Sequence, residues 1–199
     1  IYLYNSPNNT ISGNVISYMG ANGIHLDYNS TGNTVTQNRI GLGADYSTSL
    51  GNANEGVYVT ANNNVIGVAY SGNFISSNGR SGVKLDNVSG NGVYGNYIGN
   101  GSGNVGKGNG EHGVLIQGGS GNVVGGSVMG RGNVISANAL DGIRFTGTSS
   151  NTVQGNYVGL NAGGGALGNG WNGIGIYSSS NNNLIGGTTA AARNIFSGN

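Results

Sequence analysis

An asparagine stands two residues before a β-branched aliphatic residue at seven places along the chain, and a second, similar pair follows each one a few residues later. A third motif completes each unit: a glycine, usually, followed by two aliphatic residues with one position between them. The asparagines of the second pair are Asn14, Asn38, Asn73, Asn96, Asn133, Asn156 and Asn194. Self-similarity at a fixed period is the signature of repeat architectures, and it outranks local propensity. The chain is therefore expected to fold as a solenoid.

The length of the unit decides which solenoid this is. Successive third motifs lie 23, 33, 26, 31, 29 and 31 residues apart, and each unit contains three short apolar segments separated by Gly and Asn turns. Too few residues remain for helices, whereas three strands and three turns fill the unit. We predict an all-β fold, a three-sided parallel β-helix of about seven coils, running as one continuous domain over residues 1–199.

The repeated asparagines are expected to be structural. Asparagine tolerates left-handed backbone and its amide can bond to its own turn, so the seven second-pair residues are assigned to turns. Coils stack about 4.8 Å apart, which would bring identical amides into ladders. The aliphatic residues of the three motifs are expected to form three inward stacks, enough for one continuous core.

A second periodicity covers two coils, with repeats of 56, 57 and 60 residues. Even coils carry long connections before the next unit, at Gly41–Gly56, Gly99–Gly113 and Gly159–Gly173. Odd coils from the third onward carry inserts before their second asparagine, at 67–72, 125–132 and 186–193. The long loops are expected to project from one corner about every 10 Å.

Composition excludes several classes of partner. Of 199 residues, 43 are Gly and 34 are Asn, charged residues make up 7%, and the net charge is +1. Scattered basic residues give no electrostatic footprint for nucleic acid, and no apolar run is long enough to cross a bilayer. The absence of cysteine excludes disulfides and thiolate metal sites. We expect no nucleic acid, no membrane insertion, no metal and no cofactor.

Several strings carry a family resemblance: N-V-I-S-A-N-A-L-D-G-I (133–143), N-T-V-Q-G-N-Y-V-G-L-N (151–161), A-L-G-N-G-W-N-G-I (166–174) and L-I-G-G-T-T-A-A-A-R-N-I-F-S-G-N (184–199). They resemble the right-handed parallel β-helix repeats of large secreted bacterial surface proteins, in the pectate-lyase-like superfamily. The resemblance covers essentially the whole chain and implies a right-handed β-helix. It does not imply one activity, because that superfamily includes lyases, hydrolases, epimerases, adhesins and phage tailspikes.

Catalytic chemistry is poorly supported. The chain has six carboxylates, Asp27, Asp45, Glu55, Asp86, Glu111 and Asp141. The resemblance implies that hydrolases of this fold use paired Asp residues with nearby His and basic residues, in strings such as N-T-D, D-D, G-H-G and R-I-K, and none of these occurs here. We therefore predict no catalytic residues and no enzyme activity.

The best candidate for binding is the outer face of the first strand of each coil, where alternate side chains point the same way. It carries His25, Asp27, Tyr58, Lys84, Asp86 and Arg144, with Tyr58 placed for a sugar to stack between its neighbours. The alternative is an ordinary solvated face with Lys84 and Asp86 as a weak ion pair. On the long loops, Trp171, Tyr46 and His112 are a further candidate for an exposed binding edge.

The two ends of the sequence carry no capping element, although soluble solenoids usually have one. This favours coils continued by flanking sequence or by identical subunits, end to end. We predict an extracellular or cell-surface structural or adhesive solenoid, such as a fibre, stalk or surface-layer component, with surface polysaccharide as a further partner. The alternative is a carbohydrate-binding or polysaccharide-degrading β-helix that acts through the outer face of the first sheet.

Overall fold

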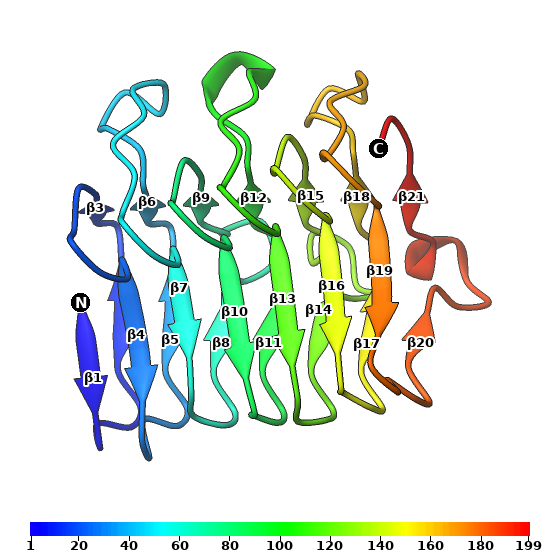
Figure 1. The fold of residues 1–199 in the computed structure, drawn as a ribbon, viewed down its shortest axis with the longest axis horizontal. Coiled ribbons are helices and arrows are strands. Elements are labelled where there is room, and N and C mark those ends of the chain that lie inside the picture. Colours follow the sequence, from blue (N-terminus) through cyan, green and yellow to red (C-terminus); the bar gives the residue numbers. More distant parts are fainter.

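A computed structural model describes the backbone of residues 1–199 and every side chain except that of Asn104. Its strands form three parallel sheets, with seven strands per sheet across the described residues, and each turn of the chain adds one strand to every sheet (Figure 1). The predicted all-β, three-sided β-helix of about seven coils is confirmed. Two short 3-10 turns, η1 (Ser102–Asn104) and η2 (Ala190–Ala192), lie in connections between strands.

Sheet 1 is built from the third motif, and its strands are the longest. In order along the solenoid they are β1 (Tyr2–Tyr4), β4 (Ile24–Asp27), β7 (Val57–Val59), β10 (Val83–Asp86), β13 (Val114–Gln117), β16 (Ile143–Thr146) and β19 (Ile174–Tyr177). They alternate aliphatic and polar residues because one face is buried and the other is not.

Sheets 2 and 3 are built from the two asparagine–aliphatic pairs. Sheet 2 contains β2 (Thr10–Ser12), β5 (Thr34–Thr36), β8 (Val65–Ile66), β11 (Gly92–Val93), β14 (Val123–Gly125), β17 (Thr152–Gln154) and β20 (Leu184–Ile185). Sheet 3 contains β3 (Val15–Ile16), β6 (Arg39–Ile40), β9 (Phe74–Ile75), β12 (Tyr97–Ile98), β15 (Val134–Ile135), β18 (Tyr157–Val158) and β21 (Ile195–Phe196).

The register of all three sheets places equivalent residues of successive coils above one another. In sheet 1, Val83 pairs with Val57 on one side and with Val114 on the other, and all three are fully buried. Sheet 3 stacks Ile75, Ile98 and Ile135 in the same way. A buried aliphatic side chain contributes about 2 kcal/mol, so these continuous stacks are the main source of stability.

Asparagine ladders run along the corners, as predicted. Between sheets 2 and 3, Asn96 accepts hydrogen bonds at Oδ1 from the backbone and amide nitrogens of Asn73, both at 2.9 Å. Its own amide donates to the Asn133 Oδ1 at 3.1 Å and to the Ile66 carbonyl at 2.8 Å. A second ladder, between sheets 1 and 2, contains Asn9, Asn33, Asn64, Asn91, Asn122, Asn151 and Asn183.

The left-handed backbone predicted for the ladder asparagines is not found. The ladder asparagines themselves do not adopt left-handed backbone; the residue immediately before them often does, as at Gln37 (φ 57°) before Asn38 and Gly95 (φ 64°) before Asn96. The amide half of the argument holds, since the Asn38 amide donates to the Thr36 carbonyl two residues earlier. Asparagine is used here for its amide and not for its φ.

A third ladder was not predicted. It lies between sheets 3 and 1, where Asn78 accepts from the Asn52 amide at 2.8 Å and donates to the Asn109 Oδ1 at 2.9 Å. The ladder continues through Asn138, Asn169 and Asn199. Its asparagines stand five residues before the first aliphatic of the sheet 1 strand that follows, from Asn52 to Asn169, and this constant spacing is a signal in the sequence.

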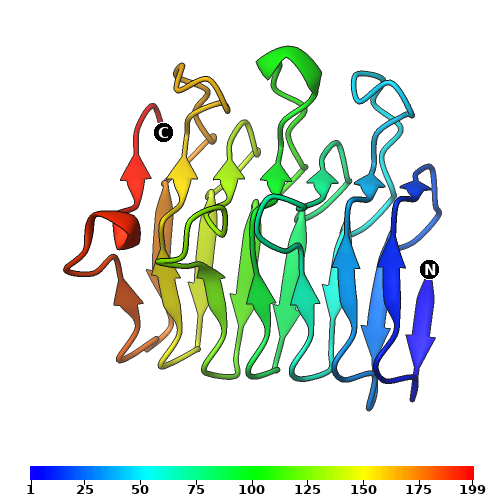
Figure 2. The same ribbon diagram turned by 180° about the vertical axis from the view of Figure 1, so that it is seen from behind.

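Two sets of loops follow the two-coil period. The long loops, residues 41–56, 99–113 and 159–173, rise together from the corner between sheets 3 and 1 (Figure 1). Each is closed by an antiparallel bridge, Leu42 to Ser49, Asn100 to Gly106 and Leu160 to Ala166. The inserts, residues 67–72, 125–132 and 186–193, protrude between sheets 2 and 3 (Figure 2). Sheet 3 therefore lies between two rows of loops.

Candidate functional site

The outer face of sheet 1 has the register that the sequence predicts. His25 lies beside Tyr58, and Tyr58 lies beside Lys84, on successive strands. Two residues further along each coil, Asp27, Thr60 and Asp86 point to the same outer face. Thr60 lies between the two aspartates, which belong to the coils on either side of it. Five of the predicted residues thus form one patch on β4, β7 and β10, which we call the sheet 1 patch: His25, Asp27, Tyr58, Lys84 and Asp86.

Arg144 is not part of that patch. It lies on β16, and Leu115 of β13 separates it from Lys84. Its guanidinium is 3.3 Å from the Asp141 Oδ2 and lies 4.1 Å over the ring of Tyr177. Arg144 therefore belongs to a second cluster, at the corner that leads into sheet 1.

The aromatic column of the sheet 1 patch has its ring faces covered. His25 stacks on Tyr58 with ring centroids 4.6 Å apart, and the Lys84 Nζ lies 5.3 Å from the Tyr58 centroid. Since these neighbours come from the coils on either side, a sugar has no open face of Tyr58 to stack on. Burial lowers the pKa of His25, so its imidazole is neutral at neutral pH.

The carboxylates of the patch are committed to protein partners. Asp27 accepts hydrogen bonds from the Thr60 hydroxyl at 2.7 Å and the Tyr2 hydroxyl at 2.8 Å, which lower its pKa. Asp86 accepts from the Tyr58 hydroxyl at 2.8 Å and lies 3.0 Å from the Lys84 Nζ. Burial, then the bond to Asp86, raises the pKa of Tyr58 to about 12. The Lys84–Asp86 pair is mostly buried and so differs from the weak surface pair that was the alternative.

A second cluster, which the sequence analysis did not identify, gathers polar side chains at the corner before sheet 1. Asp141 is fully buried and accepts hydrogen bonds from the amide of Asn172 at 2.8 Å and from Arg144. The His112 Nδ1 accepts the backbone N–H of Asp141 at 3.2 Å. One coil away, Arg80 lies 3.6 Å from Glu55 and 3.7 Å from Glu111. We call His112, Asp141, Arg144 and Asn172 the corner cluster.

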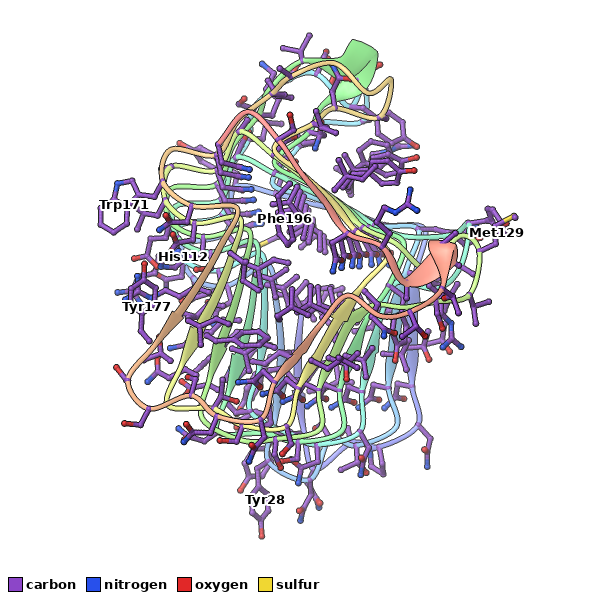
Figure 3. All side chains as sticks on the ribbon, turned by 90° about the vertical axis from the view of Figure 1, so that its right-hand side faces the viewer. Tyr28, His112, Met129, Trp171, Tyr177 and Phe196 are labelled. Carbon is purple, nitrogen blue, oxygen red and sulfur yellow. The ribbon has the colours of Figure 1, made fainter. Side chains whose placement is uncertain are left out.

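A sequence signal for this cluster exists. His112 and Asp141 each stand two residues before the first inward aliphatic of β13 and β16, so the register places them in adjacent coils. The prediction that His112 forms an exposed edge with Trp171 and Tyr46 is wrong, because His112 is 6% exposed. Trp171 is 56% exposed near sheet 1 (Figure 3), whereas Tyr46 packs on Phe74 of sheet 3.

The chemistry open to these residues is limited. Burial lowers the pKa of His112, and its Nδ1 already accepts a backbone hydrogen bond. The buried Asp141 cannot reach a substrate directly, and its oxygens are occupied by Arg144 and Asn172. Among the described residues, no group of three His, Asp or Glu side chains is placed to hold a metal ion. In the same residues, no helix has the length and apolar character needed to cross a membrane.

Comparison with known families identifies the class. Residues 1–190 match the family described as the right-handed β-helix region, and the chain belongs to that family. The resemblance noted in the sequence is thereby confirmed, and the solenoid is right-handed. A search of curated proteins gave no match.

Solved structures with the same fold include the periplasmic alginate epimerase AlgG. It superposes with a TM-score of 0.61 at 17% identity over 92% of this chain, which spans only 46% of the AlgG chain. Two mutant forms of AlgG match with the same TM-score. The single mutant is 18% identical and the double mutant is 17% identical, and this chain spans 45% of each. At this level of identity the likeness concerns the fold alone.

Proposed function

We propose that this chain is part of an extracellular, non-catalytic β-solenoid that serves as a rigid scaffold and attaches to carbohydrate. The observation that carries the proposal is the state of the carboxylates on the sheet 1 side. Asp27, Asp86 and Asp141 are all bound to hydroxyl, amide or cationic side chains of the protein. An acid or base that must exchange protons with a sugar needs a free, suitably tuned group, and these carboxylates are engaged.

The architecture supports the scaffold role. Aliphatic stacks and amide ladders along the corners continue from coil to coil, so each coil stabilises the next one. We propose that the same stacking continues into flanking coils or an identical subunit, as one continuous β-helix in a fibre, stalk or surface layer.

A polysaccharide-modifying enzyme is the second candidate. The corner cluster favours it, since it puts an imidazole beside a carboxylate and an arginine. The shared fold of an alginate epimerase is consistent with such a role. The two candidates differ in whether a bound polysaccharide is changed.

The test is to incubate the purified chain with a panel of neutral and acidic polysaccharides. Affinity electrophoresis would report binding, while NMR of the recovered polymer and assays for unsaturated or reducing ends would report chemistry. We expect retarded migration with at least one polymer and no change in its structure. Conversion of any polymer that is lost in His112→Asn would reject the non-catalytic proposal in favour of the enzyme.

A further inference from the structure

The outer face of sheet 3 is the floor of a groove. A hollow of about 430 Å³ lies over it, lined by Tyr46 of a long loop, Tyr70 of an insert, and Phe74 and Tyr97 of the floor. A second hollow, of about 310 Å³, shares Gly130 with the first and reaches Tyr157 and Arg193. The hollows join lengthwise, and the long loops and the inserts form the two walls (Figure 3).

The floor of this groove is apolar and aromatic, unlike the outer face of sheet 1. Its residues share one position, the first residue of each sheet 3 strand, and are Val15, Arg39, Phe74, Tyr97, Val134, Tyr157 and Ile195. The walls add Tyr70 and Met129, which are 76% and 79% exposed. An exposed apolar strip of this kind marks an interaction site more often than an ordinary surface.

The aromatic rings of the floor present their edges to the groove. Phe74 and Tyr97 stack along the solenoid with centroids 4.7 Å apart and planes 11° apart, so their faces meet each other. The edge of an aromatic ring carries the positive part of its quadrupole and attracts oxygen atoms. The floor therefore suits a ligand that is rich in oxygen and that also has apolar C–H surface.

The distribution of charge separates this side of the molecule from the other. Around sheet 1, every basic side chain lies within 4 Å of a carboxylate: Arg80, Lys84 and Arg144. Among the described residues, the remaining basic side chains have no carboxylate partner: Arg39, Lys107, Arg131 and Arg193. Arg39 is in the floor, held by hydrogen bonds to the Ala44 carbonyl and the Tyr46 hydroxyl, and Arg193 lies in the wall of the second hollow.

We propose that the sheet 3 groove binds an extended acidic polysaccharide, with Arg39 and Arg193 pairing with its carboxylate or sulfate groups. This inference rests on the proposed attachment to carbohydrate and adds the surface and the class of ligand. Neither arginine has a carboxylate partner among the described residues, so its positive charge is available to such anions. The Arg39 Nη1 and Nη2 each donate one hydrogen bond within the protein, which holds the guanidinium in the floor. The walls repeat every two coils, about 10 Å, which is close to the length of two pyranose rings in an extended chain.

The test uses polygalacturonate as the acidic probe and galactan as its neutral counterpart, with binding measured by calorimetry and affinity electrophoresis. We expect tighter binding of polygalacturonate, weakened by added salt. Arg39→Gln/Arg193→Gln should lower that affinity by about tenfold for each arginine removed. Arg80→Gln is the matched control, since it removes the same charge at the corner before sheet 1, outside the lining of both hollows, and should leave binding unchanged.

A second pair of variants keeps the test independent of Arg39, whose loss could loosen a long loop. Tyr157→Ala removes a side chain of the floor that is 45% exposed. Its control is Tyr18→Ala, which removes a tyrosine side chain that is 83% exposed and lies outside the groove. Weaker binding of polygalacturonate only in Tyr157→Ala, with unchanged melting in both, is the expected result.

Three results would overturn the inference. If the groove variants bind polygalacturonate like the unmodified chain while Lys84→Gln loses it, the attachment to carbohydrate stands and the groove is the wrong surface. Tighter binding of galactan than of polygalacturonate would reject the acidic class of ligand. Binding of neither polymer, with groove variants that change only self-association in sedimentation, would make the groove a protein interface and remove support for carbohydrate attachment as well.

Discussion

At the scale of single residues, the fold depends on asparagine amides that form hydrogen bonds with the coils on both sides. A ladder asparagine inside the array accepts from the coil before it and donates to the coil after it, as Asn133 does between Asn96 and Asn156. Such a buried amide has no water to replace a lost partner, so its removal leaves its neighbours unsatisfied. The asparagine content of the chain is thus a consequence of corner geometry.

Replacing Asn96 with Asp should make stability depend on pH. The carboxylate oxygen that takes the place of the amide nitrogen would face the Ile66 carbonyl and the Asn133 Oδ1, two acceptors. The protonated form is favoured in the folded state, so the folded pKa lies above the unfolded value of about 3.9. Stability should therefore fall as pH rises above about 4, with a loss of about 3 kcal/mol or more at neutral pH.

Urea unfolding at a series of pH values would measure this loss. Asn5→Asp, at an exposed turn, is the control and should show no comparable slope. Equal slopes for the two variants would contradict the ladder as the source of the effect.

The buried histidine of the corner cluster predicts a second pH dependence. Burial lowers the pKa of His112 below its ordinary value of 6.5. The unfolded state then binds a proton more readily, so the chain should lose stability as pH falls through about 6.5 towards the folded pKa. His112→Asn keeps an acceptor for the Asp141 N–H and removes the titration, so its unfolding midpoint should fall less between pH 7 and 5. An unchanged slope would mean that His112 titrates alike in both states.

At the scale of elements, the glycine before each sheet 1 strand from β4 onward sets how closely the coils approach. A Cβ added at Gly113 would lie 2.6 Å from the Gly142 carbonyl oxygen and 2.4 Å from the Ile135 side chain. The strand could not accept it without moving away from the next coil and from the Asn138 amide. These glycines are needed for close packing and not for unusual backbone angles, since Gly113 does not have a positive φ.

Gly113→Ala should therefore destabilise the chain by about 1–3 kcal/mol, as overpacking of a core does. Gly20→Ala is the matched control, because its Cβ would meet nothing within 4 Å and its φ is not positive. That variant should be neutral or slightly stabilising. Thermal melting of both variants decides the matter, and a similar loss in each would reject the steric explanation.

At the scale of the whole molecule, the solenoid is a one-dimensional array in which each coil contacts only its neighbours. Stability is then a sum of coil terms and interface terms, and it grows with the number of coils. The natural unit of growth is two coils, because the long loops and the inserts alternate with that period.

Duplicating residues 83–142 in place should produce a longer, folded rod. The new junction joins Gly142 to Val83, which repeats the native step from Gly82 to Val83. We expect small-angle scattering to show a rod longer by about 10 Å, and urea unfolding to show a higher midpoint. An expanded particle, or an unchanged midpoint, would mean that the two-coil unit is not the structural repeat.

The sequence alone determined the coil, its three strands, the inward stacks and the alternation of loops. It also determined which residues of the sheet 1 patch are neighbours on adjacent strands, such as His25 and Tyr58. These features follow because parallel strands stack in register. Residues at the same position of successive units therefore lie directly above one another. The third ladder was not predicted, although Asn52, Asn78, Asn109 and Asn138 all stand five residues before the first aliphatic of a sheet 1 strand. The asparagines before sheets 2 and 3 stand two residues from the buried apolar residue of their strand, and the prediction used that shorter spacing.

Only the tertiary structure decided what the rows can do. That His25 and Lys84 cover the faces of Tyr58, and that Asp27 and Asp86 are already bonded, depends on side-chain conformations set by neighbouring coils. The groove over sheet 3 depends on two sets of loops, far apart in the sequence, folding against one floor. Periodicity specifies position, whereas the contacts between coils determine which groups remain free to bind.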